Sequence, residues 1–250
     1  MTPNHFDMKN RTKNKNNING KIQFCDLSEI EYREALHLQH DIVRGINNGK
    51  IDHNVLLFLE HPPVFTLGKN GGRENLTVSE SFLKEKKIQI VQIERGGNIT
   101  YHGPGQLVAY PIIHLNTMAL AVTDYVERLE EVMIRTAADF GIETERNEKN
   151  RGVWISHKKL GSIGIAIRRG VSFHGLAMNI NNSLIPFCWI NPCGLDGVSM
   201  TSLKKETGKE INMTQARESM KKHFSIVFGF TLHEISRTVL KQIGRKSLKK

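Results

Sequence analysis

Residues 95–106 bring together residue types that could do chemistry, in the order Arg-Gly-Gly-Asn-Ile-Thr-Tyr-His-Gly-Pro-Gly-Gln. Glycine adds no side chain to a core, so this density indicates backbone that turns sharply or lets a ligand approach. Arg95, Thr100 and His102 place polar side chains beside that backbone. Apolar segments at 88–93 and 107–113 flank the stretch, and we expect a loop that joins two strands and forms a binding site. A long structural hairpin is the alternative.

The glycines do not follow the common phosphate-binding motifs. The stretch lacks the lysine and Ser or Thr that close a P-loop. A Gly-x-Gly-x-x-Gly pattern that starts at Gly103 fails, because residue 108 is Val. The residues therefore predict a ligand other than a nucleotide phosphate.

Cys193 lies between Pro192 and Gly194 in a turn-rich segment, the setting in which a cysteine could act as a nucleophile. A small apolar residue packed in a turn is the alternative. Cys188 lies between Phe and Trp and predicts core packing, and Cys25 lies in a strand-like segment. Three cysteines without a Cys-x-x-Cys pair argue against a disulfide framework or a structural zinc site and favour a reducing cytoplasm.

Lys158 and Lys159 open an apolar strand. Such lysines are usually edge residues that reach solvent, but a partly desolvated lysine beside a thiol could stabilise the thiolate. His174 lies inside a later strand, where a hydrogen-bonded core histidine is the common case, and Gly175 beside it indicates a close approach. The histidines have no metal-binding spacing, so no metal site is expected.

The net charge of +10 comes from the two ends of the chain. Residues 1–21 carry a net charge of +4 and the residues after Glu234 carry +6, which leaves 22–234 formally neutral. Basic ends are more often solvated tails than binding surfaces. We therefore expect no nucleic-acid-binding domain, although a nucleic acid or an acidic protein could bind the ends. No apolar run is long enough for a membrane span, and the first residues do not resemble a secretory signal.

Periodicity predicts one α/β domain in which helices cover a mixed or largely antiparallel sheet. The asparagine-rich residues 1–20 are expected to be disordered, 21–235 to form the domain, and 236–250 to form a basic tail. Ser28 and Glu31 have capping-box spacing and predict the start of a helix. Further helices are expected near 125–140, ending at Gly141, and near 216–227. Strands are expected at 22–27, 55–59, 64–67, 88–93, 107–113, 152–156, 160–167 and 171–180, with a hairpin turn at 168–170.

Four blocks taken together resemble the lipoyl(octanoyl)transferase family, the lipoate-protein ligase B type. They are Leu57–Gly68, the stretch Arg95–Gln106, Lys159–Gly164 running into Phe173–Asn179, and Pro192–Gly194 with Thr201–Leu203. The second block alone is highly specific. The resemblance implies the fold shared by biotin- and lipoate-protein ligases. It also implies transfer of octanoyl from acyl carrier protein to a lysine of a lipoyl domain, the first step of protein lipoylation.

The same resemblance implies roles for individual residues. Cys193 would hold the acyl group as a thioester, and Lys159 would lower the pKa of that cysteine and assist deprotonation of the incoming lysine. The acyl pocket would be formed by three segments, namely Arg95, Gly96, Gly97, Asn98, Ile99, Thr100, Tyr101 and His102, then Ser162, Ile163 and Gly164, then Gly175, Leu176 and Ala177.

The implied partners are acyl carrier protein, lipoyl domains of 2-oxoacid dehydrogenase complexes and the glycine cleavage H protein. No cofactor, ATP or metal is expected, because a thioester donor is already activated. An ATP-dependent lipoate or biotin ligase on the same fold is one rival, and it would need no nucleophilic cysteine. A non-catalytic module that binds lipoyl domains or carrier protein is another. An organelle transit segment also stays open.

Overall fold

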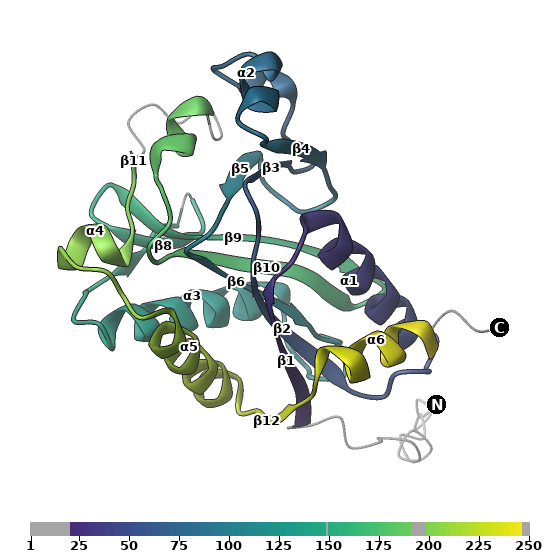
Figure 1. Ribbon diagram of the computed structural model, residues 1–250. Coiled ribbons are helices and arrows are strands. Elements are labelled where there is room, and N and C mark those ends of the chain that lie inside the picture. The colour runs from purple at the N-terminus through teal and green to yellow at the C-terminus, as the bar shows by residue number, and fades with distance from the viewer. Residues whose placement is uncertain (1–20, 149, 192–198, 247–250) are drawn as a thin grey trace, which may run out of the picture.

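The computed structural model describes residues 21–148, 150–191 and 199–246. Within these ranges nine strands form one mixed sheet in the order β12-β1-β2-β6-β10-β9-β8-β7, with β11 paired to β9 (Figure 1). Its strands are β1 (Lys21–Glu29), β2 (Asn54–Glu60), β6 (Gln106–Ile112), β7 (Glu145–Arg146), β8 (Gly152–Ile155), β9 (Lys158–Arg168), β10 (Val171–Asn179), β11 (Ser199–Met200) and β12 (Thr231–Glu234). The mixed α/β architecture predicted from the sequence is confirmed.

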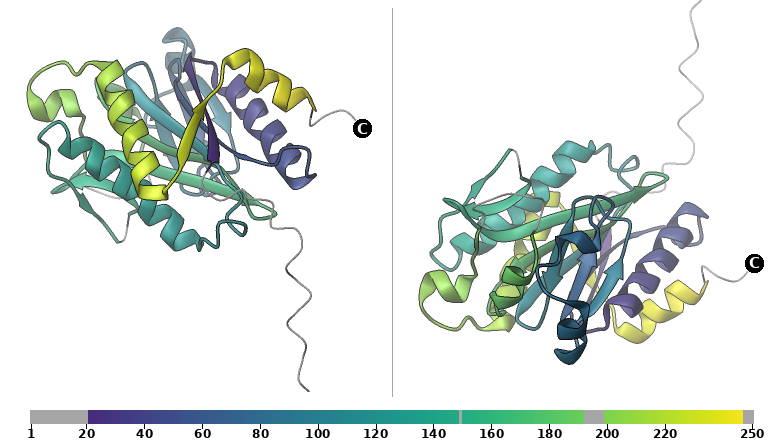
Figure 2. Two further views of the ribbon diagram at one scale, coloured as in Figure 1. Left: turned by 90° about the horizontal axis from the view of Figure 1, so that it is seen from below. Right: turned by 90° about the horizontal axis from the view of Figure 1, so that it is seen from above.

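Helices cover both faces of this sheet (Figure 2). One face packs on α3 (Val122–Ala138) and α5 (Met213–Phe228), whose apolar faces meet the sheet in one core. The other face packs on α1 (Tyr32–Asn47) and α6 (Arg237–Lys246) in a second core. The central strands β2, β6 and β10 are buried along almost their whole length, because each is covered on both faces.

A smaller sheet in the order β4-β3-β5 lies beside the main one, at the top of Figure 1. Its strands are β3 (Val64–Leu67), β4 (Gln89–Gln92) and β5 (Ile99–His102). It packs with α2 (Glu80–Glu85) and the 3-10 helix η2 (Ile185–Trp189) in a third core, and η1 (Arg73–Asn75) and α4 (Leu203–Thr207) are short connecting turns.

Two local expectations were wrong. Ser28 does not cap α1. It continues β1 with φ 54°, its amide donates to Asp26 Oδ1, and Glu31 is the N-cap without a side-chain cap bond. The stretch 95–106 is not a single loop, because Ile99–His102 pairs antiparallel with β3 as strand β5. Gly141, the predicted end of the helix near 125–140, has φ 75° but lies two residues past Asp139, the C-cap of α3.

The basic C-terminal end also differs from the predicted tail. Residues Arg237–Lys246 form α6, and Leu240 is fully buried against the α1 side of the sheet. Arg237 and Lys241 both pair with Glu34 of α1, so part of the positive charge anchors this helix. Residues 237–246 therefore form a packed helix rather than a free tail. Residues 1–20 and 247–250 lie outside the described residues. No helix in the described part is long and apolar enough to cross a membrane.

Candidate functional site

A cavity of about 580 Å³ lies between the main sheet and the small sheet. Three stretches that the sequence analysis singled out meet in its wall, namely 95–100 with His102, 162–164 and 175–177. Lys159 lines it as well. Of the described site residues, Tyr101 alone does not line the cavity. It packs instead against the rings of Phe65 and Phe187 in the core of the small sheet.

The loop 95–98 is held in place by backbone hydrogen bonds to neighbouring segments. The amide of Gly96 donates to Ile165 O at 2.9 Å and so joins the loop to β9. The amide of Gly68 donates to Asn98 O at 2.9 Å, which joins it to the loop after β3. Gly97 has φ 83°, a left-handed conformation that favours glycine. Because the Gly96 amide is already used, that amide cannot also bind a ligand.

Arg95 organises the base of this loop. Its guanidinium donates from Nη2 to Thr66 O at 2.7 Å and to Thr66 Oγ1 at 2.9 Å, and from Nη1 to Gly96 O at 3.0 Å. These bonds connect the loop to the buried strand β3, and the side chain of Arg95 also borders the cavity. Arg95 thus fixes the position of the loop in addition to lining the site.

The opposite wall is the antiparallel pair β9 and β10. Ser162 pairs with Ala177, and Gly164 pairs with Gly175. Gly164 leaves room for the Arg95 side chain and Gly175 for the backbone of β6. Ile163, Leu176 and Ala177 make the wall apolar. Such a wall suits an extended apolar chain that lies against strand backbone.

Lys159 lies near one end of β9 and is half-buried. Its ammonium Nζ donates to Asn150 Oδ1 at 2.6 Å and lies 5.1 Å from the centre of the Trp154 ring. Lys158 instead pairs with Glu206 at 2.5 Å. The two adjacent lysines therefore have different surroundings, and Lys159 is the one that borders the cavity.

Cys193 lies outside the described residues, together with Pro192 and Gly194. The chain on either side of it reaches the site, because Phe187 and Met200 both line the cavity. Met200 of β11 also pairs with Lys159 of β9, and the amide of Thr201 donates to Lys159 O at 2.9 Å. Cys188, predicted as core filler, is exposed, so that prediction was wrong. The aromatic side chains of Phe187 and Trp189, which flank Cys188 in η2, pack in the core of the small sheet instead.

Several residues outside the predicted site segments complete the wall. They are Tyr32, Val108, Tyr110, Val126, Asn150, Arg151, Ile165, His174, Phe187 and Met200. Most come from elements far apart in the chain that meet only in the folded sheet. His174 was considered as a core residue, and the neighbouring Gly175 was the signal of a close approach.

Three buried histidines lie in or next to the wall of the cavity, and two of them, His102 and His174, line it. His61 contacts Ile30 O and Tyr110 OH, each at 2.8 Å, and His102 Nδ1 contacts Gln106 Oε1 at 2.7 Å. Burial lowers the pKa of His61 to about 4 and the pKa values of His102 and His174 to about 3. All three rings are therefore neutral at pH 7.

These histidines predict a stability that depends on pH. In the unfolded chain a histidine titrates near pH 6.5, so between about pH 4 and 6.5 the unfolded state binds more protons than the folded state. We expect the free energy of unfolding to be constant above this window and to fall on acidification. The slope should approach about 1.4 kcal/mol per pH unit for each histidine. Urea unfolding at pH 7.5, 6.0 and 5.0 measures it.

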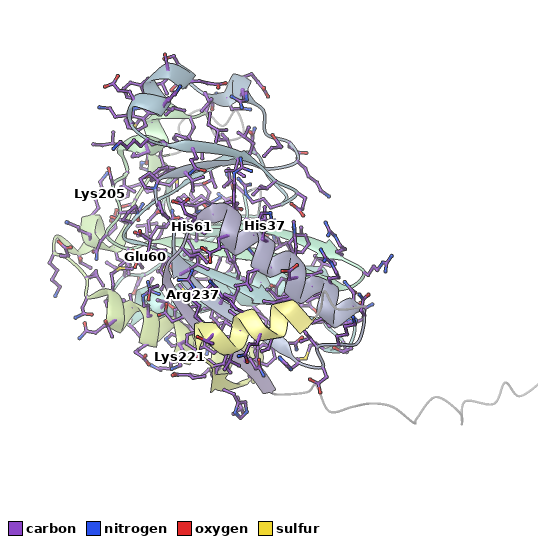
Figure 3. The ribbon with its side chains drawn as sticks, turned by 45° about the vertical axis from the view of Figure 1, so that its right-hand side comes forward. His37, Glu60, His61, Lys205, Lys221 and Arg237 are labelled. Atoms are coloured by element: carbon purple, nitrogen blue, oxygen red, sulfur yellow. The ribbon has the colours of Figure 1, made fainter. Side chains whose placement is uncertain are left out.

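Two glutamine variants check the cause of this slope. His61→Gln should reduce it by about a third, since one of three buried histidines is removed. His37→Gln, on the exposed surface of α1, should leave it unchanged (Figure 3). Equal stability at pH 7.5 and 5.0 would contradict the prediction.

Among the described residues no group of three or more His, Cys, Asp or Glu side chains is placed to hold a metal ion. Cys193 and its neighbours lie outside the described residues, so the absence of a metal stays a prediction.

The sequence matches known proteins over most of its length. Residues 31–225 match the pattern of the lipoyl protein ligase A/B catalytic domain. The octanoyltransferase of Desulfotalea psychrophila is 50% identical over 206 residues, which cover 82% of this chain and 92% of that protein. The octanoyltransferase of Caldicellulosiruptor bescii is 42% identical over 221 residues, which cover 88% and 96%.

Solved structures share the fold at low sequence identity. The bipartite lipoate protein ligase of Thermoplasma acidophilum superposes with a TM-score of 0.72 at 16% identity and covers 91% of each chain. A lipoate-protein ligase A bound with ATP gives a TM-score of 0.72 at 16% identity and covers 91% of this chain and 93% of its own. The expected likeness to the lipoate-protein ligase fold is confirmed.

Proposed function

This chain belongs to the lipoyl protein ligase A/B catalytic domain family, and from that premise we propose that it is an octanoyltransferase that acts in protein lipoylation. We propose octanoyl-acyl carrier protein as the donor. The acceptor is a lysine of lipoyl domains in 2-oxoacid dehydrogenase complexes and of the glycine cleavage H protein. The cavity with Lys159 at its border and an apolar strand wall is the observation that supports this most. The cytoplasm stays the predicted compartment.

The proposed reaction has two steps. The Cys193 thiolate attacks the thioester carbonyl of the donor and an octanoyl thioester forms on Cys193. The carrier sulfur leaves as a thiol with the proton of the Lys159 ammonium, which becomes an amine. The acceptor lysine, as a neutral amine, attacks this thioester, and its nitrogen gives one proton to the Lys159 amine. An amide forms and the Cys193 thiolate leaves. No ATP or metal enters, because the donor is already a thioester.

Lys159 has a proposed part in each step. As an ammonium it stabilises the Cys193 thiolate, since opposite charges favour each other's ionised form. As an amine, after it has given its proton to the leaving carrier thiol, it accepts the proton that the acceptor nitrogen loses when the amide forms. Asn150 and the Trp154 ring, which both contact the ammonium, hold it at the border of the cavity. Ile163, Leu176 and Ala177 give the octanoyl chain an apolar surface.

The decisive experiment is a search for the acyl-enzyme. The purified protein is mixed with octanoyl-acyl carrier protein without ATP, and intact mass and peptide mapping should find one octanoyl group on Cys193. Addition of a lipoyl domain should transfer the octanoyl group from Cys193 to a lysine of that domain. Cys188→Ser, which removes a nearby exposed thiol, is the matched control and should keep the adduct.

The rival functions give other results. Absence of the adduct together with transfer that requires ATP would support an ATP-dependent ligase. Binding of a lipoyl domain without transfer, unaffected by Cys193→Ser, would support a non-catalytic module. An adduct on Cys188 would refute the proposed nucleophile.

A further inference from the structure

Glu130 is a carboxylate on the buried face of α3. Its side chain is fully buried, like those of Leu129 and Met133 on the same helix. A carboxylate that leaves water costs free energy unless cations and hydrogen bonds compensate it. Even a compensated pair is weak evidence for stability, because an apolar residue of similar volume often stabilises a fold as well or better. The partners of Glu130 therefore indicate what this carboxylate does.

The two oxygens of Glu130 hold the chain where it enters β8. Oε1 accepts a hydrogen bond from the amide of Gly152 at 3.0 Å. Oε2 lies 3.4 Å from Nη1 of Arg151 and 3.5 Å from Nε of Arg146. The two arginine side chains are partly exposed, whereas the bond to Gly152 is buried. That bond joins the start of β8 to the packed core of α3.

The segment 150–152 also contacts the side chain of Lys159. Asn150 Oδ1 accepts the hydrogen bond from the ammonium, and a Cβ at Gly152 would lie only 2.7 Å from Lys159 Cε. A glycine here lets the lysine stem lie against the backbone. Trp154, opposite Lys159 in the pairing of β8 with β9, donates from Nε1 to Asn150 O at 3.0 Å. The segment therefore fixes both the stem and the charged end of Lys159.

We propose that Glu130 is a positioning residue that keeps the Lys159 ammonium in one place through its bond to the Gly152 amide. This rests on the proposed function for the role of Lys159. Glu130 is not among the residues that line the cavity, so it acts through the lysine and not on the acyl group. When the bond to Gly152 is lost, the segment 150–152 shifts and releases the lysine to solvent.

The reactivity of Lys159 measures its position without any transfer. The purified protein is treated with trace acetic anhydride at several pH values, and peptide mapping gives the labelling rate of Lys159 relative to the exposed Lys205 of α4 (Figure 3). In Glu130→Met, which fills the space without an oxygen acceptor, this ratio should rise about tenfold. That factor corresponds to about 1.4 kcal/mol, the scale of one hydrogen bond. An unchanged ratio would overturn the proposal.

Two further variants separate the hydrogen bond from the charge and from the helix surface. Glu130→Gln keeps an acceptor for the Gly152 amide but carries no charge, so its labelling ratio should stay near that of the wild type. Glu131→Gln is the matched control, because Glu131 is the next residue of α3 and pairs with Arg135 and Arg146 instead. It should leave the ratio unchanged. An equal rise in Glu130→Gln and Glu130→Met would overturn the role of the Gly152 bond. Glu130→Ala replaces the methionine variant if that protein does not fold.

Transfer rates test whether Glu130 acts through Lys159. Glu130→Met should slow octanoyl transfer by about tenfold to a hundredfold, the scale expected for a displaced catalytic group. It should also move the alkylation profile of Cys193 to higher pH, because the thiolate loses its fixed cation. In a protein that already carries Lys159→Met, the same change should slow transfer by less than about threefold, since the positioned group is gone. Equal slowing in both backgrounds would indicate a general structural effect and overturn the proposal.

The labelling and transfer measurements fail separately. If Lys159 labelling responds as expected while no octanoyl adduct forms on Cys193 of the wild type, the proposed function fails and the positioning role stands. If the adduct forms but the labelling of Lys159 does not respond to Glu130→Met, the positioning role fails alone.

Discussion

Replacing Lys159 with methionine should slow octanoyl transfer by about a hundredfold to a thousandfold, the range expected when a general acid–base group is lost. Methionine keeps much of the length of the side chain and its contact with the Trp154 ring but carries no charge and accepts no proton. The first step slows because the Cys193 thiolate loses its cation. The second step slows because the acceptor lysine loses its base. Single-turnover rates of adduct formation and adduct transfer separate the two.

Replacing Lys159 with arginine separates the effect of the positive charge from the effect of the general base. Lys159→Arg keeps the cation but cannot accept a proton at neutral pH. The pH profile of Cys193 alkylation should therefore move to higher pH in Lys159→Met and stay near that of the wild type in Lys159→Arg. Transfer to the acceptor lysine should be slow in both. An alkylation profile unchanged in Lys159→Met would contradict the proposed ion pair.

Lys158→Met is the matched control for this pair of variants. Lys158 precedes Lys159 on β9 but pairs with Glu206, away from the cavity wall. Its loss should leave the alkylation profile unchanged. An equal loss of transfer in Lys158→Met would indicate that the general charge of this strand end matters, rather than the position of one ammonium.

The segments predicted best are those whose pattern is local. The apolar run 55–59 is buried within β2, and the three-to-four spacing of 125–140 predicted α3. The Arg168-Arg169-Gly170 turn joins β9 to β10, with positive φ at Arg169 and Gly170. In each case the information lies within one stretch of chain, where periodicity and turn residues report it directly.

The segments predicted poorly depend on contacts that are distant in the sequence. Strand β5 forms inside the glycine-rich stretch because β3, more than thirty residues earlier, supplies its hydrogen bonds. Helix α6 looked like a basic tail because its charges are visible in the sequence, whereas the α1 surface that buries Leu240 is not. Tertiary packing overrides local composition in both cases.

The same distinction applies to the site. The glycine and lysine segments could be found from motif and order, because each is continuous in the chain. Tyr32 and Tyr110 could not, since one begins α1 and the other lies in β6, and only the folded sheet brings them to the cavity. Sequence motifs therefore predicted the continuous segments of the wall better than the single residues that distant elements bring to it.

Gly175→Ala should destabilise the protein and nearly abolish transfer. An added Cβ at this position would overlap the carbonyl oxygen of Ala109 and lie 2.7 Å from Cδ of Pro111, both in the neighbouring strand β6. Backbone cannot move aside as a flexible side chain can, so β10 must shift in the centre of the sheet. We expect a loss of about 3 kcal/mol, at the upper end for overpacking. In a chain of this size that loss lowers the melting temperature by roughly 6–12 °C.

Gly96→Ala gives the matched comparison, because Gly96 also lines the cavity. A Cβ there would lie 3.7 Å from Ile165 O, an ordinary contact, and Gly96 is not among the glycines with positive φ. This variant should melt within a few degrees of the wild type, and urea unfolding of both variants measures the difference. Full stability of Gly175→Ala would show that β6 and β10 can separate to admit a methyl group. If instead the two variants lose transfer equally while only Gly175→Ala loses stability, then bare glycine backbone at the cavity wall is itself required for the acyl chain.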